Sequence, residues 1–352
     1  MKNILASSGN GLIIRESDYM RYVLAIDGGG TKTDSVIGDE RGNIIATYRG
    51  SASNHQIVGI EETAIVIEQA ISNTCNLANI HYSQLSYIFL GIAGADLDYD
   101  FNLLTTRLSP SFKGIPFSIV NDSWVALAAG SIEGWGVVSI CGTGSNVAAK
   151  DKDGNTGILR ALSYELGGIR GGNHIISDAM HHACRCDEKT GEYTMLVKYI
   201  PVELGCKNMK EVIYKRYTKK ISNESMNKIV KLVFNLANKR DLVCQNILIK
   251  MGEELGKQIS GLICKLNIQD EKVPIVLAGS IYEKGENMLL LDSLTLSLRK
   301  AVPDFELIML DLPPVAGAYF EALRNIGINV DEEIAEHVRA SIALFNGLGG
   351  EE

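Results

Sequence analysis

Short apolar runs that end in glycine-rich or acidic turns recur along the chain, and such runs are typical of buried β-strands. Runs of this kind lie near residues 22–27, 34–38, 43–49, 86–92 and 117–120. Apolar residues at helical spacing predict a helix over residues 60–79, and another begins near Trp124, with Asn121 or Asp122 as its N-cap. The N-terminal third is therefore predicted to combine strands with helices.

The middle of the chain repeats the pattern of its start. Residues 137–155 contain an apolar run, a Gly-Thr-Gly-Ser turn, a second run and a polar turn. Residues 23–46 show the same pattern around a glycine-rich turn, and we call these two segments the second and the first hairpin. Residues 208–264 predict mostly helices, and a strand over 274–277 leads into a third glycine site. Near the end of the chain, the segment LPPVAGAYFEALRNIG predicts a turn followed by a helix. The two hairpins predict a duplicated architecture with a nucleotide between its halves.

The turn after the first predicted strand carries the strongest chemical signal. Asp27 precedes three glycines, which are followed by Thr31 and Lys32. Glycines let backbone N–H groups approach a polyphosphate, and an acid beside them can hold hydrated Mg²⁺. A strand follows instead of the helix that a P-loop or a dinucleotide-binding turn requires. The run resembles the phosphate hairpin of actin-like ATPases, although taken alone it also fits an ordinary glycine-rich turn.

Composition narrows the class of protein. The 352 residues predict two domains, and 46% hydrophobic with 22% charged residues is typical of a globular chain. A net charge of −8 argues against a nucleic-acid partner. Seven scattered cysteines fit reduced thiols in the cytoplasm. We find neither a signal peptide nor an apolar run of the about 18 residues that a membrane span needs, so no membrane partner is expected.

Sparse prolines and the lack of a low-complexity linker predict domains that meet over a hinge. We expect an N-terminal extension over residues 1–21, a small domain over 22–130 and a larger C-terminal domain over 131–352.

Four motifs together resemble the BadF/BadG/BcrA/BcrD ATPase family, and within it the N-acetylglucosamine kinase branch. They are DGGGTKTD from Asp27, VNDSWVAL from Val120, GTGSN from Gly142 and LAGSIYEKGE from Leu277. The resemblance runs from about Tyr22 to Ile326. It implies a two-domain α/β fold of the actin-like ATPase (ribonuclease H-like) type, with mixed sheets flanked by helices and the active site in the interdomain cleft.

The resemblance also implies roles for particular residues. Asp27 would hold Mg²⁺, and Asp122 would be the catalytic base. The phosphates of ATP would contact Gly29, Gly30, Thr31 and Lys32 from the first hairpin and Gly142, Thr143 and Gly144 from the second. Gly279 and Ser280 would lie beside adenosine, and the sugar would contact Asn54, Asp122 and Thr143. From the residues alone, Asp122 fits a helix N-cap equally well, and Asn54 fits a turn residue.

These roles predict a kinase that transfers the γ-phosphate of ATP to a hydroxyl of N-acetylglucosamine or a related hexosamine, with a small sugar as its partner. One alternative is an ATPase that activates a 2-hydroxyacyl-CoA dehydratase through an iron–sulfur cluster. Cys184 and Cys186, with one residue between them, are poorly spaced for such a cluster. The other alternative is a sugar sensor without turnover. Family members are often dimers, so the resemblance leaves a homodimer open.

One loop departs from the family. N-acetylglucosamine kinases carry a Gly-Asp-Glu-Gly-Ser loop whose acids bind sugar hydroxyls. Here Gly168 and Ile169 stand where those acids are expected, Arg170 adds a cation, and Glu165 lies nearby as a displaced acid. Arg170 suits a carboxylate-bearing sugar, such as a lactyl-bearing muramic sugar, or pairs with a neighbouring carboxylate.

Overall fold

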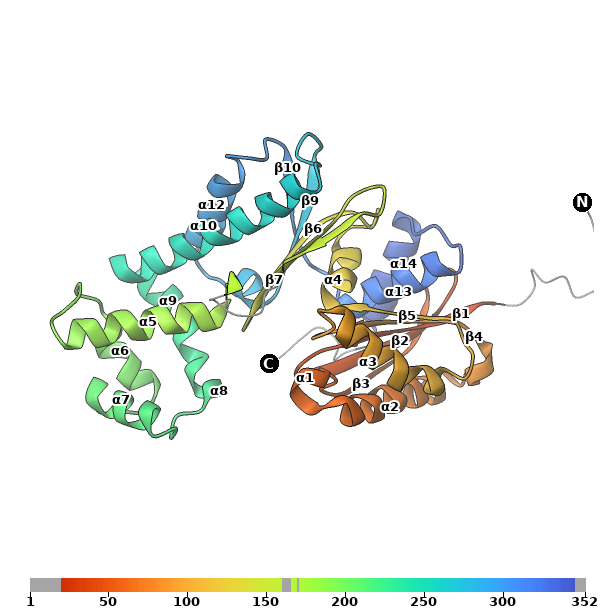
Figure 1. Ribbon diagram of the computed structural model, residues 1–352, viewed down its shortest axis with the longest axis horizontal. Helices are drawn as coiled ribbons and strands as arrows, with labels where there is room; N and C mark the ends of the chain where they lie inside the picture. Colours follow the sequence, from red (N-terminus) through yellow and green to blue (C-terminus); the bar gives the residue numbers. More distant parts are fainter. Residues whose placement is uncertain (1–19, 160–165, 170, 346–352) are drawn as a thin grey trace, which may run out of the picture.

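The computed structural model describes residues 20–159, 166–169 and 171–345, which form two lobes, each built on a five-stranded sheet (Figure 1). The strands of the first sheet are β1 (Tyr22–Gly28), β2 (Lys32–Asp39), β3 (Ile44–Ser51), β4 (Leu85–Ile92) and β5 (Phe117–Asn121). The strands of the second sheet are β6 (Gly136–Cys141), β7 (Ser145–Lys150), β8 (Thr156–Ile158), β9 (Val273–Ala278) and β10 (Phe305–Met309).

Helices connect and cover the strands. The helices of the first lobe are α1 (His55–Val58), α2 (Ile60–Ala78), α3 (Asp98–Leu108), α4 (Asp122–Gly130) and, from the end of the chain, α13 (Pro314–Asn325) and α14 (Glu332–Ile342). Two short 3-10 turns, η2 (Tyr82–Gln84) and η3 (Ser109–Phe112), lie in the same lobe. The other helices are α5 (Gly172–Asp187), α6 (Leu196–Glu203), α7 (Met209–Tyr217), α8 (Asn223–Met226), α9 (Lys228–Asn238), α10 (Leu242–Lys265), α11 (Ser280–Glu283) and α12 (Leu289–Leu298).

The two sheets share one topology. Their strand orders are β3-β2-β1-β4-β5 and β8-β7-β6-β9-β10. In each sheet the first three strands form an antiparallel meander, and the last two run parallel to the first. The predicted duplication and the predicted mixed sheets flanked by helices are confirmed. The strands predicted from apolar runs and the helix over 60–79 are also found, with small shifts at their ends.

The first sheet is covered on both faces, which explains the continuous apolar run of β1. Leu24 and Ile26 of β1 pack with α2 and α3, whereas Val23 and Ala25 pack on the opposite face with α4, α13 and α14. A strand buried on both faces has no polar alternation. The sheet is thus the rigid centre of the first lobe, and its strand ends are held in fixed positions.

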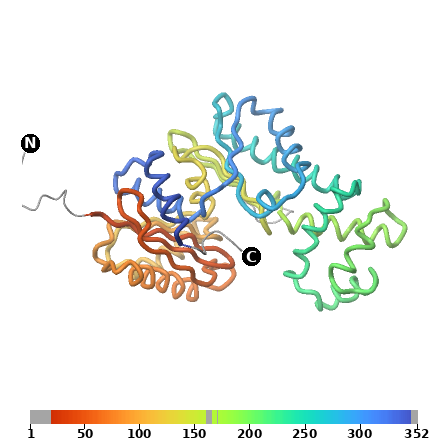
Figure 2. Tube along the Cα trace, turned by 180° about the vertical axis from the view of Figure 1, so that it is seen from behind, coloured from red at the N-terminus to blue at the C-terminus, as the bar shows by residue number. Residues whose placement is uncertain are grey.

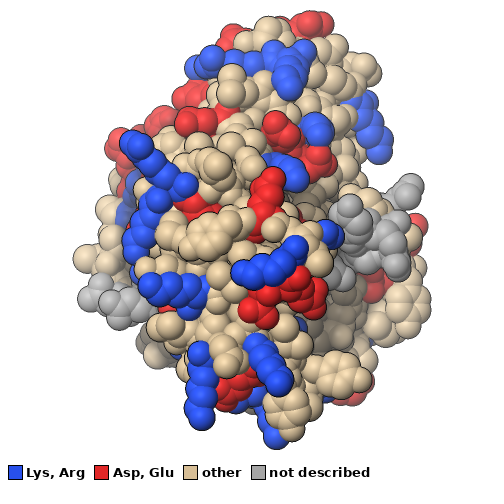
Figure 3. Space-filling view, turned by 90° about the vertical axis from the view of Figure 1, so that its left-hand side faces the viewer, with Lys and Arg blue, Asp and Glu red and all other residues tan. Residues whose placement is uncertain are grey.

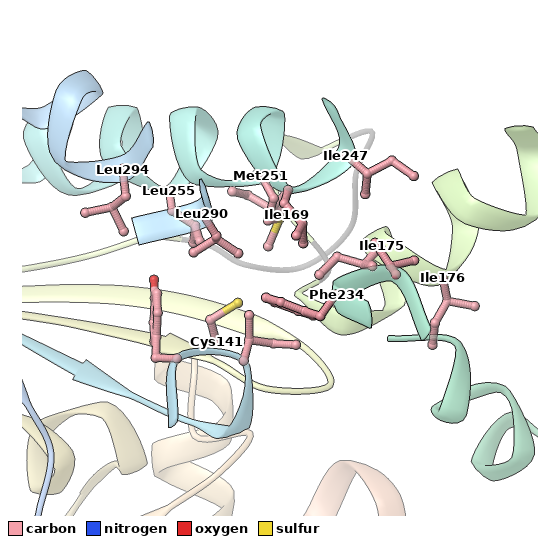
Figure 4. Close-up of a cluster of buried hydrophobic side chains, with 14 of the residues drawn as sticks. Cys141, Ile169, Ile175, Ile176, Phe234, Ile247, Met251, Leu255, Leu290 and Leu294 are labelled. Atoms are coloured by element: carbon pink, nitrogen blue, oxygen red, sulfur yellow. The ribbon is translucent and has the colours of Figure 1, made fainter. Parts of the chain in front are cut away.

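The second sheet packs one face against α10, α12 and the helices beyond them. Figure 4 shows part of this core, with Cys141, Ile175, Phe234 and Met251 directed into one apolar cluster. Cys141 closes β6 and is fully buried there. Burial raises the pKa of its thiol to about 12, so it is a packing residue and not a nucleophile.

Helix α4 joins the two lobes. Val125 and Ala129 of α4 pack with α13 in the core of the first lobe, while Ala126 and Leu127 of α4 pack against the second sheet. The contact between α4 and α13 is so close that a Cβ on Gly317 would lie 1.9 Å from the carbonyl oxygen of Val125. Only glycine fits at this crossing.

The end of the chain returns to the first lobe, as Figure 2 shows from behind, where the blue segment lies against the red one. Tyr319 and Phe320 of α13 and Val338 of α14 pack with Val23 and Val36 of the first sheet. The predicted boundary placed residues 131–352 in one C-terminal domain, whereas α13 and α14 pack with the first sheet. Burial of their apolar faces against β1 and β2 determines this position.

The surface carries both signs of charge. Lysines, arginines and acids alternate over the end of the molecule near α6 and α7 (Figure 3), where Lys215 pairs with Glu211 at 2.9 Å. Within the described residues, we find no helix that is long and apolar enough to cross a membrane.

Candidate active site

Three aspartates gather where parallel strands of the first sheet end. β1, β4 and β5 are neighbours in register, with Gly28 opposite Ile92 and Ile92 opposite Asn121. Asp27 lies at the end of β1, Asp96 follows the turn after β4, and Asp122 directly follows β5. In open α/β sheets, ligands bind outside the carboxyl ends of the strands, so this edge is the candidate site.

The first predicted phosphate hairpin is a tight turn at this edge. The N–H of Gly29 donates to the carbonyl of Lys32 at 2.9 Å, which leaves Gly30 and Thr31 exposed at the tip. A Cβ on Gly28 would lie 2.4 Å from Ser53 Oγ, so the close packing under the turn requires glycine. Packing beneath the turn thus requires a glycine, while the tip of the hairpin is exposed.

Asp27 lies beside other acids under this turn. Burial and the charges of Asp122 and Asp34 raise its pKa to about 8, and Lys32 opposes the shift. Carboxylates held together in this way favour a cation between them, and hard oxygen ligands are those that Mg²⁺ prefers. Within the described residues, no three His, Cys, Asp or Glu side chains are grouped closely enough to hold a metal ion by themselves. A Mg²⁺ ion beside Asp27 would therefore take its other ligands from water and the phosphates of ATP.

Lys32 points along the hairpin towards Asp34. Its ammonium lies 3.4 Å from Asp34 Oδ2, while Arg49 binds the same carboxylate with Nε at 2.6 Å and Nη2 at 3.1 Å. Asp34 is 3% exposed and shares two cations, so part of the charge of Lys32 is already compensated. The bidentate Arg49 pair, which the sequence did not reveal, stabilises the base of the hairpin.

Asp122 is the first residue of α4, but it does not cap the helix. The cap is Asn121, whose Oδ1 accepts a hydrogen bond from the N–H of Ser123 at 3.0 Å. Burial and the charge of Asp96 raise the pKa of Asp122 to about 6, against the backbone N–H groups of Ser123 and Asp122. Its carboxylate is thus tuned towards the range of a general base.

Asn54 is an N-cap and also lies beside the first hairpin. Its Oδ1 accepts from the N–H of Gln56 at 2.9 Å, and its own N–H donates to the carbonyl of Gly29 at 3.2 Å. Among the described residues, no hydrogen bond involves its Nδ2. The turn-residue interpretation is therefore correct for the side-chain oxygen.

Asp96 is a site residue that the sequence did not identify. It is half-buried and carries the charge that raises the pKa of Asp122. The signal was present in the sequence GIAGAD, where an acid follows a predicted strand and a glycine turn. That pattern matches the way in which Asp122 follows its own strand.

The second hairpin lies at the matching edge of the second sheet. The N–H of Gly142 donates to the carbonyl of Gly144 at 2.9 Å, and the N–H of Gly172 at the start of α5 donates to the carbonyl of Gly142 at 2.7 Å. Thr143 and Gly144 are exposed at the tip. Asn146 of β7 reaches across with its Nδ2 to Ser123 Oγ at 3.2 Å, next to Asp122.

Gly279 brings the third glycine site against this hairpin. It has φ +101°, and a Cβ there would lie 2.7 Å from the carbonyl oxygen of Cys141. Glycine is thus needed on both conformational and steric grounds. Its N–H donates to Glu283 Oε1 at 3.0 Å, which fixes the start of α11 and places Ser280 beside the second hairpin.

A cavity of about 630 Å³ opens between these elements. Its wall brings together Gly142, Thr143 and Ser280, three of the residues for which the sequence predicts nucleotide contacts. The sequence missed the opposite wall, where α9 contributes Val230, Lys231 and Phe234. The volume lies in the range of small-molecule sites.

In the loop that departs from the family, Ile169 is directed into the core. Ile169 is 9% exposed and packs in the core of the second lobe, where Figure 4 labels it. Its carbonyl accepts from Ser145 Oγ at 2.7 Å. Ile169 thus stabilises the loop by apolar packing. Arg170 and Glu165, on which the carboxylate-bearing sugar hypothesis depended, lie outside the described residues.

Comparison with known proteins identifies the family of the chain. A model of the BadF/BadG/BcrA/BcrD ATPase family matches residues 24–322. An N-acetyl-D-glucosamine kinase of Dictyostelium discoideum is 28% identical over 315 residues, which cover 86% of this chain and 98% of the relative. An N-acetylmuramic acid/N-acetylglucosamine kinase of Clostridium acetobutylicum is 27% identical over 263 residues, which cover 74% and 86% of the two chains.

A solved structure shares the fold. The crystal structure of a Chromobacterium violaceum protein, provisionally assigned as an N-acetylglucosamine kinase, superposes with a TM-score of 0.63 at 20% identity. The superposition covers 87% of this chain and 99% of that one.

Proposed function

The chain belongs to the BadF/BadG/BcrA/BcrD ATPase family, and we propose that it is an ATP-dependent kinase that phosphorylates a hydroxyl of N-acetylglucosamine or a related hexosamine. Two relatives with kinase names, one acting on N-acetylglucosamine and one also on N-acetylmuramic acid, support this assignment over an activator or a sensor.

The observation that best supports the proposal is the position of Asp122, which lies at the same sheet edge as the first glycine hairpin and next to the second. Asp122 accepts the proton of the sugar hydroxyl as the hydroxyl oxygen forms its bond to the γ-phosphorus. The bond between the γ-phosphorus and the bridging oxygen breaks, and ADP leaves. A base with a pKa of about 6 is largely ionised at neutral pH, while its raised pKa strengthens it as a proton acceptor.

The hairpins and the cavity provide the nucleotide site. In the first lobe, Gly29 closes the turn whose tip, Gly30 and Thr31, faces the phosphates with backbone and hydroxyl groups. In the second lobe, Gly142 closes the turn whose tip, Thr143 and Gly144, faces them from the other side. The adenosine enters the cavity beside Gly279 and Ser280, where Val230 and Phe234 offer apolar surface. Phosphoryl transfer depends mainly on such positioning.

Asp27 holds Mg²⁺ in this proposal, and Lys32 adds positive charge at the rim of the hairpin. Magnesium bound with ATP neutralises charge on the transferred phosphate. Asn54 and Thr143 contact the sugar, with the Nδ2 of Asn54 directed to a hydroxyl. Closure of the lobes would exclude water so that the sugar takes the phosphate.

The proposal also covers cell compartment and assembly. All seven cysteines are unpaired, which suits the reducing cytoplasm in which ATP is available. We propose a cytoplasmic enzyme, and a homodimer remains a prediction that sedimentation analysis can check.

The test is ATP turnover across a sugar panel, with ADP release coupled to an absorbance readout. The panel holds glucose, glucosamine, N-acetylglucosamine, N-acetylmannosamine and N-acetylmuramic acid, with a control without sugar. We expect stimulation by an N-acetylated hexosamine. Hydrolysis that is independent of sugar, or no hydrolysis, would contradict the proposal.

A further inference from the structure

Asp96 stands between the two segments that present Asn54 and Asp122, and the proposed reaction gives it no role so far. Its Oδ1 accepts a hydrogen bond from Asn121 Nδ2 at 2.9 Å. Its Oδ2 accepts from Gln56 Nε2 at 3.4 Å. One carboxylate thus contacts a neighbour of each of the two residues that face the sugar.

Next to Asp122, the hydrogen bond to Asp96 fixes the orientation of the side-chain amide of Asn121. Asn121 is 2% exposed, and its Nδ2 donates to Asp96 and to the carbonyl of Ala95 at 3.2 Å. With its nitrogen held by these acceptors, Asn121 turns its oxygen to the N–H of Ser123. The first turn of α4, and with it Asp122, is fixed by this arrangement.

On the side of Asn54, the loop that carries Asp96 supports α1 directly. Gln56 Nε2 also donates to the carbonyl of Gly94 at 2.9 Å. Gly94 has φ +84°, and a Cβ there would lie 2.6 Å from Asn54 Oδ1. The backbone of the loop therefore packs against Asn54 itself, and glycine is required for this approach.

A second acid fixes Asp96 in turn. Asp100 Oδ2 accepts from the N–H groups of Asp96 at 3.3 Å and Leu97 at 2.9 Å. Asp100 Oδ1 lies 3.0 Å from Nε2 of His55, which is buried next to Asn54. The loop after β4 and the start of α1 are thus tied together at several points.

We propose that Asp96 is a positioning residue for the sugar side of the reaction, whose carboxylate holds Asn121 and Gln56 so that Asp122 and Asn54 face one substrate. The inference rests on the proposed kinase function. Its charge also makes Asp122 a better proton acceptor. Among the described residues, Asp96 has no hydrogen bond to either glycine hairpin, so a change at Asp96 should affect the sugar side more than the nucleotide side.

The test compares steady-state kinetics of Asp96→Ala, Asp96→Asn and the matched control Asp98→Asn, with N-acetylglucosamine and ATP varied separately. Asp98 is an exposed acid two positions further on. For Asp96→Ala, we expect kcat/KM for the sugar to fall on the order of 10²-fold, because small displacements of reacting groups have effects of this size. KM for ATP should stay within about twofold. Asp96→Asn keeps an oxygen for Asn121 and should recover part of the loss, while Asp98→Asn should match wild type.

A double-mutant cycle with Gln56→Ala separates positioning from direct sugar contact. If Asp96 acts through Gln56, the double variant loses less than the product of the single effects. Equal losses in Asp96→Ala and Asp96→Asn, with multiplicative Gln56 effects, would make Asp96 a direct sugar ligand and overturn the inference. An equal rise in KM for ATP, or no change in any variant, would also overturn it.

Thermal midpoints of all variants check that they fold. If Asp96→Ala does not fold, Asp96→Asn and its cycle with Gln56→Ala carry the test. An active wild type with unaffected variants overturns only the role of Asp96. A wild type without sugar-dependent turnover overturns the kinase proposal, and the inference fails with it.

Discussion

The two sheets have the same strand order, yet their functional edges carry different chemistry. The edge of the first sheet presents the carboxylates of Asp27, Asp96 and Asp122. The edge of the second presents the glycines of β6–β7 and β9, beside an open cavity. A duplicated scaffold has thus kept the hairpin and the parallel strands, while the residues at the strand ends have diverged.

The difference suggests a division of tasks. In the proposed kinase, both edges offer a glycine hairpin to the phosphates, and only the first edge adds the aspartates that would hold the cation and take a proton from the acceptor. Two acidic edges would repel a polyphosphate, and two glycine edges would lack a base. Substitutions on each edge should therefore affect different substrates.

The largest effect is expected for Asp122→Asn on the acidic edge. Loss of the proton acceptor should lower kcat by about 10²–10⁴-fold. Nucleotide affinity should be unchanged, because the glycine edge is intact. Coupled ADP release measures the first quantity and calorimetric ADP titration the second. An unchanged rate would remove Asp122 from the mechanism.

The next effect concerns Asp27→Asn. Loss of a charged ligand for Mg²⁺ should lower kcat by about 10²-fold, the size typical of removing one electrostatic group from a transition state. The Mg²⁺ concentration for half-maximal rate should rise as well. A magnesium titration of both proteins checks this, and identical titration curves would place the cation elsewhere.

On the glycine edge, Val230→Trp should fill the cavity without changing any of the three aspartates of the first edge. We expect KM for ATP to rise about tenfold, which corresponds to a loss of about 1.4 kcal/mol. KM for the sugar should stay constant, and Lys228→Ala on the same helix serves as control. A rise in both KM values would mean that the two edges are not independent.

A smaller effect is expected from pH. Asp122 has a pKa of about 6, and only its ionised form accepts a proton. The sugar kcat/KM should therefore fall below about pH 6, approaching a tenfold loss per pH unit, as expected for a single essential base. Nucleotide affinity measured over the same range provides the comparison. A flat sugar profile down to pH 5 would contradict the assignment.

The smallest expected effect is on stability. The pKa of Asp27 is raised in the folded protein from 3.8 to about 8, so the folded state binds the proton more tightly and stability falls as pH rises through that window. Asp27→Asn should therefore raise Tm by a few degrees at pH 8 without Mg²⁺, and by less at pH 5. Melting curves at the two pH values measure the difference. Equal shifts at both would show that Asp27 is not strained by burial and its acidic neighbours.

Local signals made much of the acidic edge and of the glycine hairpins predictable. Asp27 and Asp122 each follow an apolar run, and Gly29 and Gly142 lie in turns that a short segment specifies. Such features depend on neighbours in the sequence. The same local patterns predicted where the main strands lie along the chain.

Features that depend on distant contacts were missed. Val230 and Phe234 look like ordinary apolar positions of a helix, and only tertiary packing brings them to the second hairpin. Helices α13 and α14 return to the first sheet because their apolar faces match it, which no local signal indicates. Ile169 replaced an expected acid, and its place in the core became evident only with its neighbours.

The most direct test of the account is product analysis with ATP and N-acetylglucosamine, for wild type and Asp122→Asn side by side. Mass spectrometry quantifies the phosphosugar, and a coupled assay quantifies ADP. The account predicts phosphosugar in equal amount to ADP for wild type and almost none for the variant, with equal ADP affinity in both. ADP formed without phosphosugar, or equal product from both proteins, would contradict it.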